Sequence, residues 1–141
     1  MELHLRIIGG ILIILAIIHA SFPKQFMWKT ELSSLSLINR QMMTVHTFFI
    51  ALTVLLMGVL CIYSANEIVN TSFGRQIALG LFIFWFVRLF VQFFVYSKDL
   101  WKGKRFETMM HIVFAITWLY LSAVFFMIAF SINASPLGIE K

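Results

Sequence analysis

An arginine and a glutamine lie inside one of the long apolar stretches of this chain. Arg88 and Gln92 are four residues apart, so a helix would place them on one face, with Trp85 and Tyr96 close by. At helical rise Arg88 lies about 12 Å before Tyr96, near the middle of a bilayer. Arginine keeps its charge when buried, yet none of the six Asp and Glu residues lies inside an apolar stretch. We therefore expect a loop carboxylate, or a polar or anionic ligand, to pair with Arg88.

Three histidines are candidate ligands for a metal ion or a haem. His19 ends the first apolar stretch, His46 begins the second and His111 begins the fourth, so an up-and-down bundle would bring them to one end. With Glu107 they offer ligand types that suit zinc, iron or copper, and two of them could bind haem iron. The sequence contains no HxxxH or CxxC spacing. Each histidine taken singly is better explained as an interfacial residue that reaches water or a headgroup.

These polar residues leave three interpretations open. In the first, they only bond to neighbouring helices or hold two subunits together. In the second, the histidines bind a transition metal or a haem, and the sequence does not say which of these cofactors it would be. In the third, Arg88 holds the anionic head of an amphiphile or a quinone carbonyl, and Gln92 and Asn39 orient it. No nucleophile–base pair is visible in the sequence, so enzymatic activity stays undecided.

The composition makes lipid the natural surroundings of the chain. Of its 141 residues, 61% are hydrophobic and only 12% are charged, whereas soluble domains carry about 25% charged residues. The net charge of +5 does not indicate nucleic-acid binding, because the basic residues are scattered at the ends of apolar stretches. Basic residues in such places contact lipid headgroups and fix the topology.

Four apolar stretches are each close to the ~20 residues that a helix needs to cross a bilayer. They cover residues 5–22, 45–63, 77–96 and 109–132. The sequence therefore predicts an all-α fold, a four-helix transmembrane bundle with up-down-up-down topology, as one integral membrane domain over residues 1–141. Pro23 and Pro136 are predicted helix stops, and Gly58 and Gly80 are expected to allow close helix contact.

The connections predict the orientation of the chain. Residues 23–44 mix basic and aromatic side chains and should lie on the membrane surface, with the second helix beginning near Ser36. Residues 23–44 and 97–108 hold seven Lys and Arg residues, against three on the other side. The positive-inside rule then places these two connections in the cytoplasm and both termini outside. We expect a bacterial inner membrane.

In size, helix number and expected termini, the chain resembles the membrane-bound enzymes of glutathione and eicosanoid metabolism. Those enzymes carry an acidic residue followed by arginine early in the second helix, where this chain has Asn39-Arg40. The resemblance is therefore architectural. We predict an intramembrane His, Arg and Gln site near the cytoplasmic side that binds an anionic amphiphile, quinone, haem or metal. The alternative is a non-catalytic accessory subunit. Expected partners are membrane lipids and a homo-oligomer or larger membrane complex, with no nucleic acid.

Overall fold

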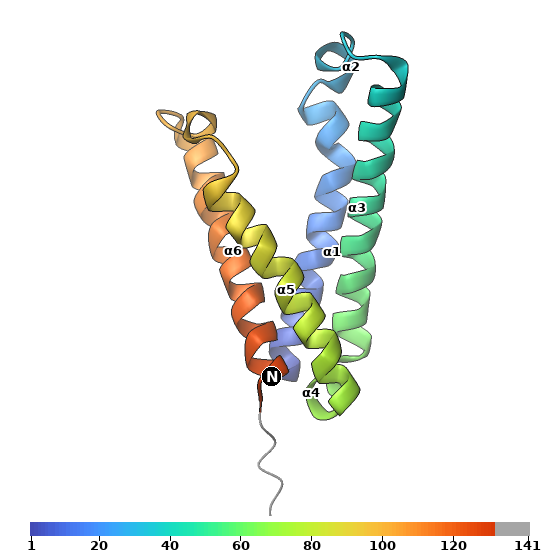
Figure 1. Cartoon of the computed structure of the whole chain (residues 1–141), viewed down its shortest axis with the longest axis vertical. Helices are drawn as coiled ribbons and strands as arrows, with labels where there is room; N and C mark the ends of the chain where they lie inside the picture. The colour runs from blue at the N-terminus through green and yellow to red at the C-terminus, as the bar shows by residue number, and fades with distance from the viewer. Residues whose placement is uncertain (132–141) are drawn as a thin grey trace, which may run out of the picture. The chain divides into compact units, whose positions relative to one another are not determined.

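The computed structural model describes residues 1–131, and within this range the chain is helical with no strand (Figure 1). Four helices are long and apolar enough to cross a membrane. They are α1 (Glu2–Gln25), α3 (Leu37–Tyr63), α5 (Ser72–Phe94) and α6 (Arg105–Ala129). The predicted all-α fold with four apolar helices is confirmed. The predicted stop at Pro136 lies outside the described residues.

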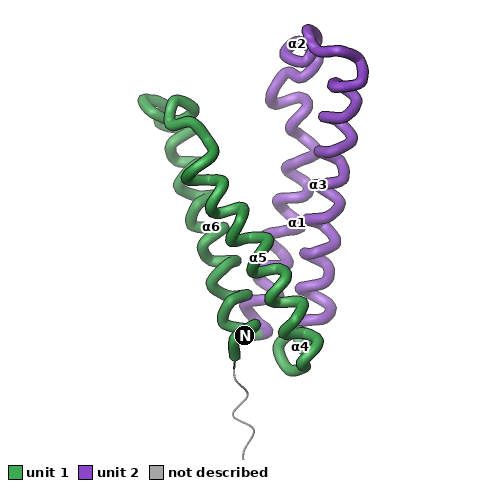
Figure 2. The backbone as a smooth tube through the Cα atoms, viewed as in Figure 1, with its two compact units in different colours: residues 1, 66–141 green, residues 2–65 purple. Residues whose placement is uncertain are grey.

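Three short helices lie between the long ones: α2 (Trp28–Glu31), α4 (Ala65–Asn70) and the 3-10 helix η1 (Lys98–Leu100). The chain divides into two compact units, coloured differently in Figure 2. In the first, residues 2–65, α1 packs against α3, and we call it the N-terminal hairpin. In the second, residues 66–131, α5 packs against α6, and we call it the C-terminal hairpin.

The bounds of the long helices confirm some details of the sequence prediction and correct others. Ser36 is the N-cap of α3, as expected for the second long helix. The predicted stop at Pro23 is wrong, because α1 continues to Gln25 with this proline in its last turn. There the proline removes one hydrogen-bond donor without breaking the helix. The chain turns instead at Met27, whose backbone is left-handed with φ 48°, a common conformation just past a helix end.

Two glycines let the backbones of α1 and α3 approach each other in the N-terminal hairpin. A Cβ at Gly9 would lie 2.5 Å from Cγ1 of Ile62 and 2.7 Å from the carbonyl oxygen of Gly58. A Cβ at Gly58 would lie 2.9 Å from the carbonyl oxygen of Gly9. The expectation of close contact is confirmed for Gly58 and is wrong for Gly80, where a Cβ would meet nothing within 4 Å.

Candidate functional site

A hydrogen-bonded chain of three polar side chains joins α5 to α6 in the C-terminal hairpin. Arg88 Nη1 donates to Gln92 Oε1 at 3.2 Å, along one face of α5. Gln92 Nε2 lies 2.6 Å from His111 Nδ1 on α6. Gln92 is only 6% exposed, and Arg88 and His111 are partly buried. The structure thus brings together three of the residues that the sequence singled out.

The direction of these hydrogen bonds follows from the donor chemistry of arginine. A guanidinium can only donate, so the oxygen of the Gln92 amide faces Arg88 and its NH₂ group faces the imidazole. His111 Nδ1 must therefore accept, which requires a neutral ring with its proton on Nε2. The glutamine links a permanent cation to a neutral imidazole, and both of its polar ends are occupied.

Aromatic rings surround the Arg88 guanidinium. Its Cζ lies 5.6 Å from the ring centroid of Tyr96 and 5.2 Å from that of Trp118, both within cation–π range. Trp118 in turn stacks on Trp85, with ring centroids 5.0 Å apart and an interplanar angle of 14°. Because α5 ends at Phe94, Arg88 lies about 9 Å from the helix end, nearer than the sequence suggested.

The positive charge of Arg88 has no carboxylate partner in the described part of the chain. No ion pair joins this guanidinium to an Asp or Glu within residues 1–131, and its only hydrogen bond there goes to the neutral Gln92 amide. The two loop carboxylates that could have turned toward it are Glu31 and Glu107, and both are exposed, in α2 and in the first turn of α6. A guanidinium has five N–H donors, so most of its donor capacity is left for other acceptors.

Two further donors lie beside the arginine. The indole Nε1 atoms of Trp85 and Trp118 are buried and have no hydrogen-bond partner. A buried donor without an acceptor costs about 1–3 kcal/mol, so these atoms add to the shortage of acceptors at this place. Arg88 and the two indoles therefore offer more N–H donors than the C-terminal hairpin supplies acceptors for.

The remaining predicted site residues lie in the N-terminal hairpin. His19 Nδ1 bonds to the carbonyl oxygen of Leu15, 2.7 Å away in its own helix. Asn39 and His46 are exposed on α3. Among residues 1–131, no group of three or more His, Cys, Asp and Glu side chains could hold a metal ion. The suggested histidine and Glu107 ligand set thus gains no support as a metal site.

One residue of the site was missed from the sequence. The Trp101 ring, in the connection between α5 and α6, stacks on the His111 ring with centroids 4.0 Å apart at 12°. Thr108 holds this connection in place, because its hydroxyl donates to the carbonyl oxygen of Trp101 at 2.7 Å. No spacing rule pairs these residues, since the contact depends on how the connection folds back over α6.

The two bonded histidines should differ in tautomer, which gives a spectroscopic prediction. His19 Nδ1 must donate to a carbonyl, which can only accept, whereas His111 Nδ1 must accept from Gln92. In nitrogen-15 spectra of the protein at a pH where both rings are neutral, His111 should show a bare Nδ1 and His19 a protonated one. Replacing Gln92 with leucine should change the His111 signal and should not change the His19 signal. The same tautomer at both residues would contradict the hydrogen-bonded chain.

The comparisons with family models, curated proteins and solved structures each found no match to this chain.

Proposed function

We propose that the chain is a small integral membrane protein that binds an anionic amphiphile at Arg88. The observation that carries this proposal is a partly buried guanidinium with no carboxylate partner within residues 1–131. An anionic head would provide the acceptor that the C-terminal hairpin lacks. A carboxylate is a good match, because it can take two parallel hydrogen bonds from one guanidinium.

Each neighbour of the arginine has a role in this proposal. Gln92 holds one nitrogen of the guanidinium and leaves the others for the ligand. Tyr96 and Trp118 offer ring faces that favour the cation and keep water away from it. The tail would lie along exposed apolar side chains on the same side of α5 as Arg88, such as Phe84, which is four residues earlier. If residues 97–108 are cytoplasmic, the site lies toward that side.

The other ligands considered from the sequence receive less support. His111 uses Nδ1 for Gln92, and one face of its ring lies against Trp101, which restricts its approach to a haem iron or metal ion. A quinone carbonyl is an acceptor without charge, so it would leave the Arg88 cation uncompensated. An anionic head satisfies both the charge and the N–H donors.

Quenching of tryptophan fluorescence by dibromostearate tests the proposal. In a Trp28→Phe background the remaining tryptophans, at 85, 101 and 118, all belong to the C-terminal hairpin. We expect saturable quenching by dibromostearate in detergent micelles. The matched methyl ester, which has no charge, should bind at least about tenfold more weakly because it cannot form the charge-assisted pair.

Two arginine variants show whether the quenching depends on this site. Arg88→Gln should lose the preference for the acid over the ester, whereas Arg6→Gln, an exposed arginine of α1, should keep it. Equal quenching by the acid and the ester in the wild-type protein would overturn the proposed function. So would an unchanged preference in Arg88→Gln.

A further inference from the structure

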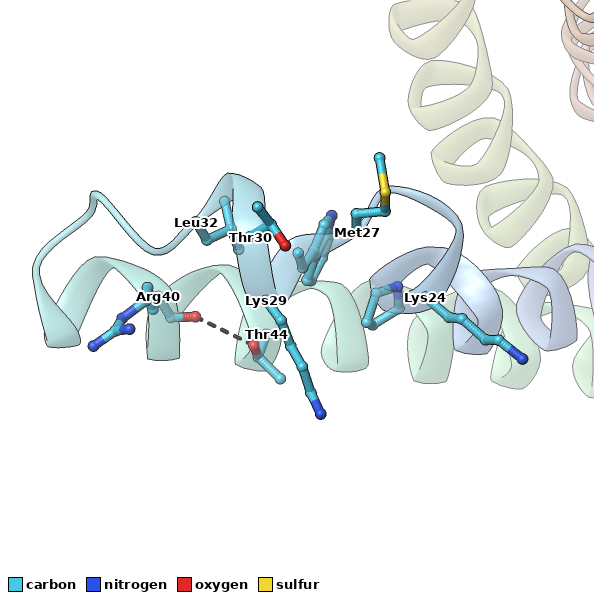
Figure 3. A pocket seen from close by; sticks show the side chains of 9 residues that line it. Lys24, Met27, Lys29, Thr30, Leu32, Arg40 and Thr44 are labelled. Atoms are coloured by element: carbon cyan, nitrogen blue, oxygen red, sulfur yellow. Dashed lines mark hydrogen bonds between the residues drawn. The ribbon is translucent and has the colours of Figure 1, made fainter.

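The N-terminal hairpin contains a basic pocket where α1, α2 and α3 meet. The pocket has a volume of about 830 Å³, within the range of about 300–1,000 Å³ that is usual for small-molecule sites. Its charged lining residues are Lys24, Lys29 and Arg40. Figure 3 shows Lys29 between the other two, with the three charged ends pointing apart. We call this site the basic pocket.

The charge of the basic pocket is not balanced by the protein around it. None of the nine residues that line it is acidic. Glu31 belongs to the same short helix as Lys29 but does not line the pocket. Within residues 1–131, none of the three basic side chains forms an ion pair with a carboxylate. Trp28 and Thr30 also line the pocket and offer hydrogen-bond donors, so its chemistry suits an anion with several oxygens.

An apolar groove continues from the basic pocket along the hairpin. Its volume is about 340 Å³, and it shares two lining residues with the pocket, Pro23 and Thr44. Its other walls are mainly small and apolar side chains of α1 and α3, including Ala20 and Ala51. The Thr44 hydroxyl donates to the Arg40 carbonyl oxygen at 3.2 Å, so this shared residue is held within α3 (Figure 3).

We propose that the basic pocket and the apolar groove together bind one anionic phospholipid. The phosphate would lie at Lys29, Lys24 and Arg40 on either side would turn toward the headgroup, and an acyl chain would follow the groove between α1 and α3. This second site is independent of the ligand proposed at Arg88, because it is built from the N-terminal hairpin alone.

The chain itself favours a lipid over a soluble phosphate compound. A soluble anion would use the basic pocket and leave the adjoining groove without a role. The pocket also lies at the ends of two helices that are apolar enough to cross a membrane, where headgroups are found. Clusters of Lys and Arg beside membrane-spanning helices attract anionic lipids, and interfacial tryptophans such as Trp28 lie at headgroup level.

Native mass spectrometry of the full chain tests this proposal with an equimolar mixture of dioleoyl phosphatidylglycerol and dioleoyl phosphatidylcholine. All proteins carry Arg88→Gln, so that the C-terminal hairpin contributes no charge at its proposed site. We expect the anionic lipid to be retained preferentially. The triple variant Lys24→Gln, Lys29→Gln, Arg40→Gln should lower its affinity at least about tenfold and abolish the preference.

Matched control variants show whether lipid binding depends on the charges of the basic pocket or only on net charge. They also show whether it depends on the width of the groove or is changed by a larger side chain anywhere. Lys98→Gln, Lys102→Gln, Lys104→Gln removes the same charge from the other basic connection and should keep the preference. Ala20→Leu should narrow the groove and weaken retention of the lipid. Ala123→Leu, at an exposed position of α6, should not weaken retention of the lipid. Circular dichroism should show that every variant remains helical, so that a lost preference is not caused by unfolding.

Three results would overturn the proposal. The first is no preference for phosphatidylglycerol in the Arg88→Gln protein. The second is an equal loss of preference in the two triple variants, which would mean that only net charge matters. The third is displacement of the lipid by an equal concentration of glycerol phosphate, which would make the groove irrelevant and the site one for soluble phosphates. None of these results bears on Arg88, since that residue is replaced throughout.

Discussion

Replacing Gly9 with alanine should make the N-terminal hairpin less stable than the Gly10→Ala variant by about 1–3 kcal/mol, the usual cost of overpacking a tight contact. The new methyl group would lie 2.7 Å from the Gly58 carbonyl oxygen and 2.5 Å from an Ile62 side-chain carbon. The side chain can turn away, but the carbonyl belongs to the backbone of α3. The two helices would have to separate, and their packing along α1 and α3 would loosen.

Gly10→Ala is the matched control, because a Cβ at Gly10 would meet nothing within 4 Å. Both variants gain the same helix propensity, about 1 kcal/mol relative to glycine, so the difference between them isolates the helix contact. The free energy of unfolding can be measured by titrating the protein from mild detergent into dodecyl sulfate. Equal stabilities of the two variants would contradict the close approach of α1 and α3.

Changes at Gln92 should separate the stability of the C-terminal hairpin from ligand binding. Gln92→Leu keeps the volume but removes the partners of Arg88 and His111 together. Hydrogen bonds between membrane helices contribute about 0.6 kcal/mol on average and up to about 1.7, so we expect a loss of about 1–2 kcal/mol. Gln92→Glu instead supplies a built-in carboxylate for Arg88. A carboxylate cannot donate to His111, so the imidazole must carry its proton on Nδ1 to keep this contact. With that change of tautomer, stability should be nearly unchanged, and dibromostearate binding should weaken at least about tenfold.

The control for these variants is Gln76→Leu, which replaces an exposed glutamine on the same helix. It should change neither the stability nor the binding of dibromostearate. Stability is measured by the same detergent titration, and binding by the tryptophan quenching described above. If Gln92→Glu bound dibromostearate as well as the wild-type protein, an anion would not be needed to neutralise Arg88. That result would leave Gln92 with a structural role only.

The sequence was sufficient for features that depend on neighbouring residues in one helix. Apolar length alone predicted the four long helices, and the spacing of four residues predicted the contact between Arg88 and Gln92. The N-cap at Ser36 was predicted because serine is a common helix start. These inferences need only helical geometry, which is the same in every protein.

Features that depend on contacts between helices or on loops were harder to predict. Gly9 resembles its neighbour Gly10 in sequence, and only the packing of α3 distinguishes them. The stacking of Trp101 on His111 depends on the path of a connection. The basic pocket likewise needs α2 to fold beside the ends of two long helices, which brings Lys24, Lys29 and Arg40 around one cavity.

The central claim is that an anionic head group neutralises Arg88, and a solid-state NMR distance tests it most directly. Protein with nitrogen-15 arginine is placed in phosphatidylcholine bilayers with stearate carrying carbon-13 at its carboxyl carbon. We predict that a guanidinium nitrogen lies within about 4 Å of that carbon, as in an ion pair, and that Arg88→Gln removes the coupling. Coupling that is absent in the wild-type protein, or that survives in Arg88→Gln, would contradict the account.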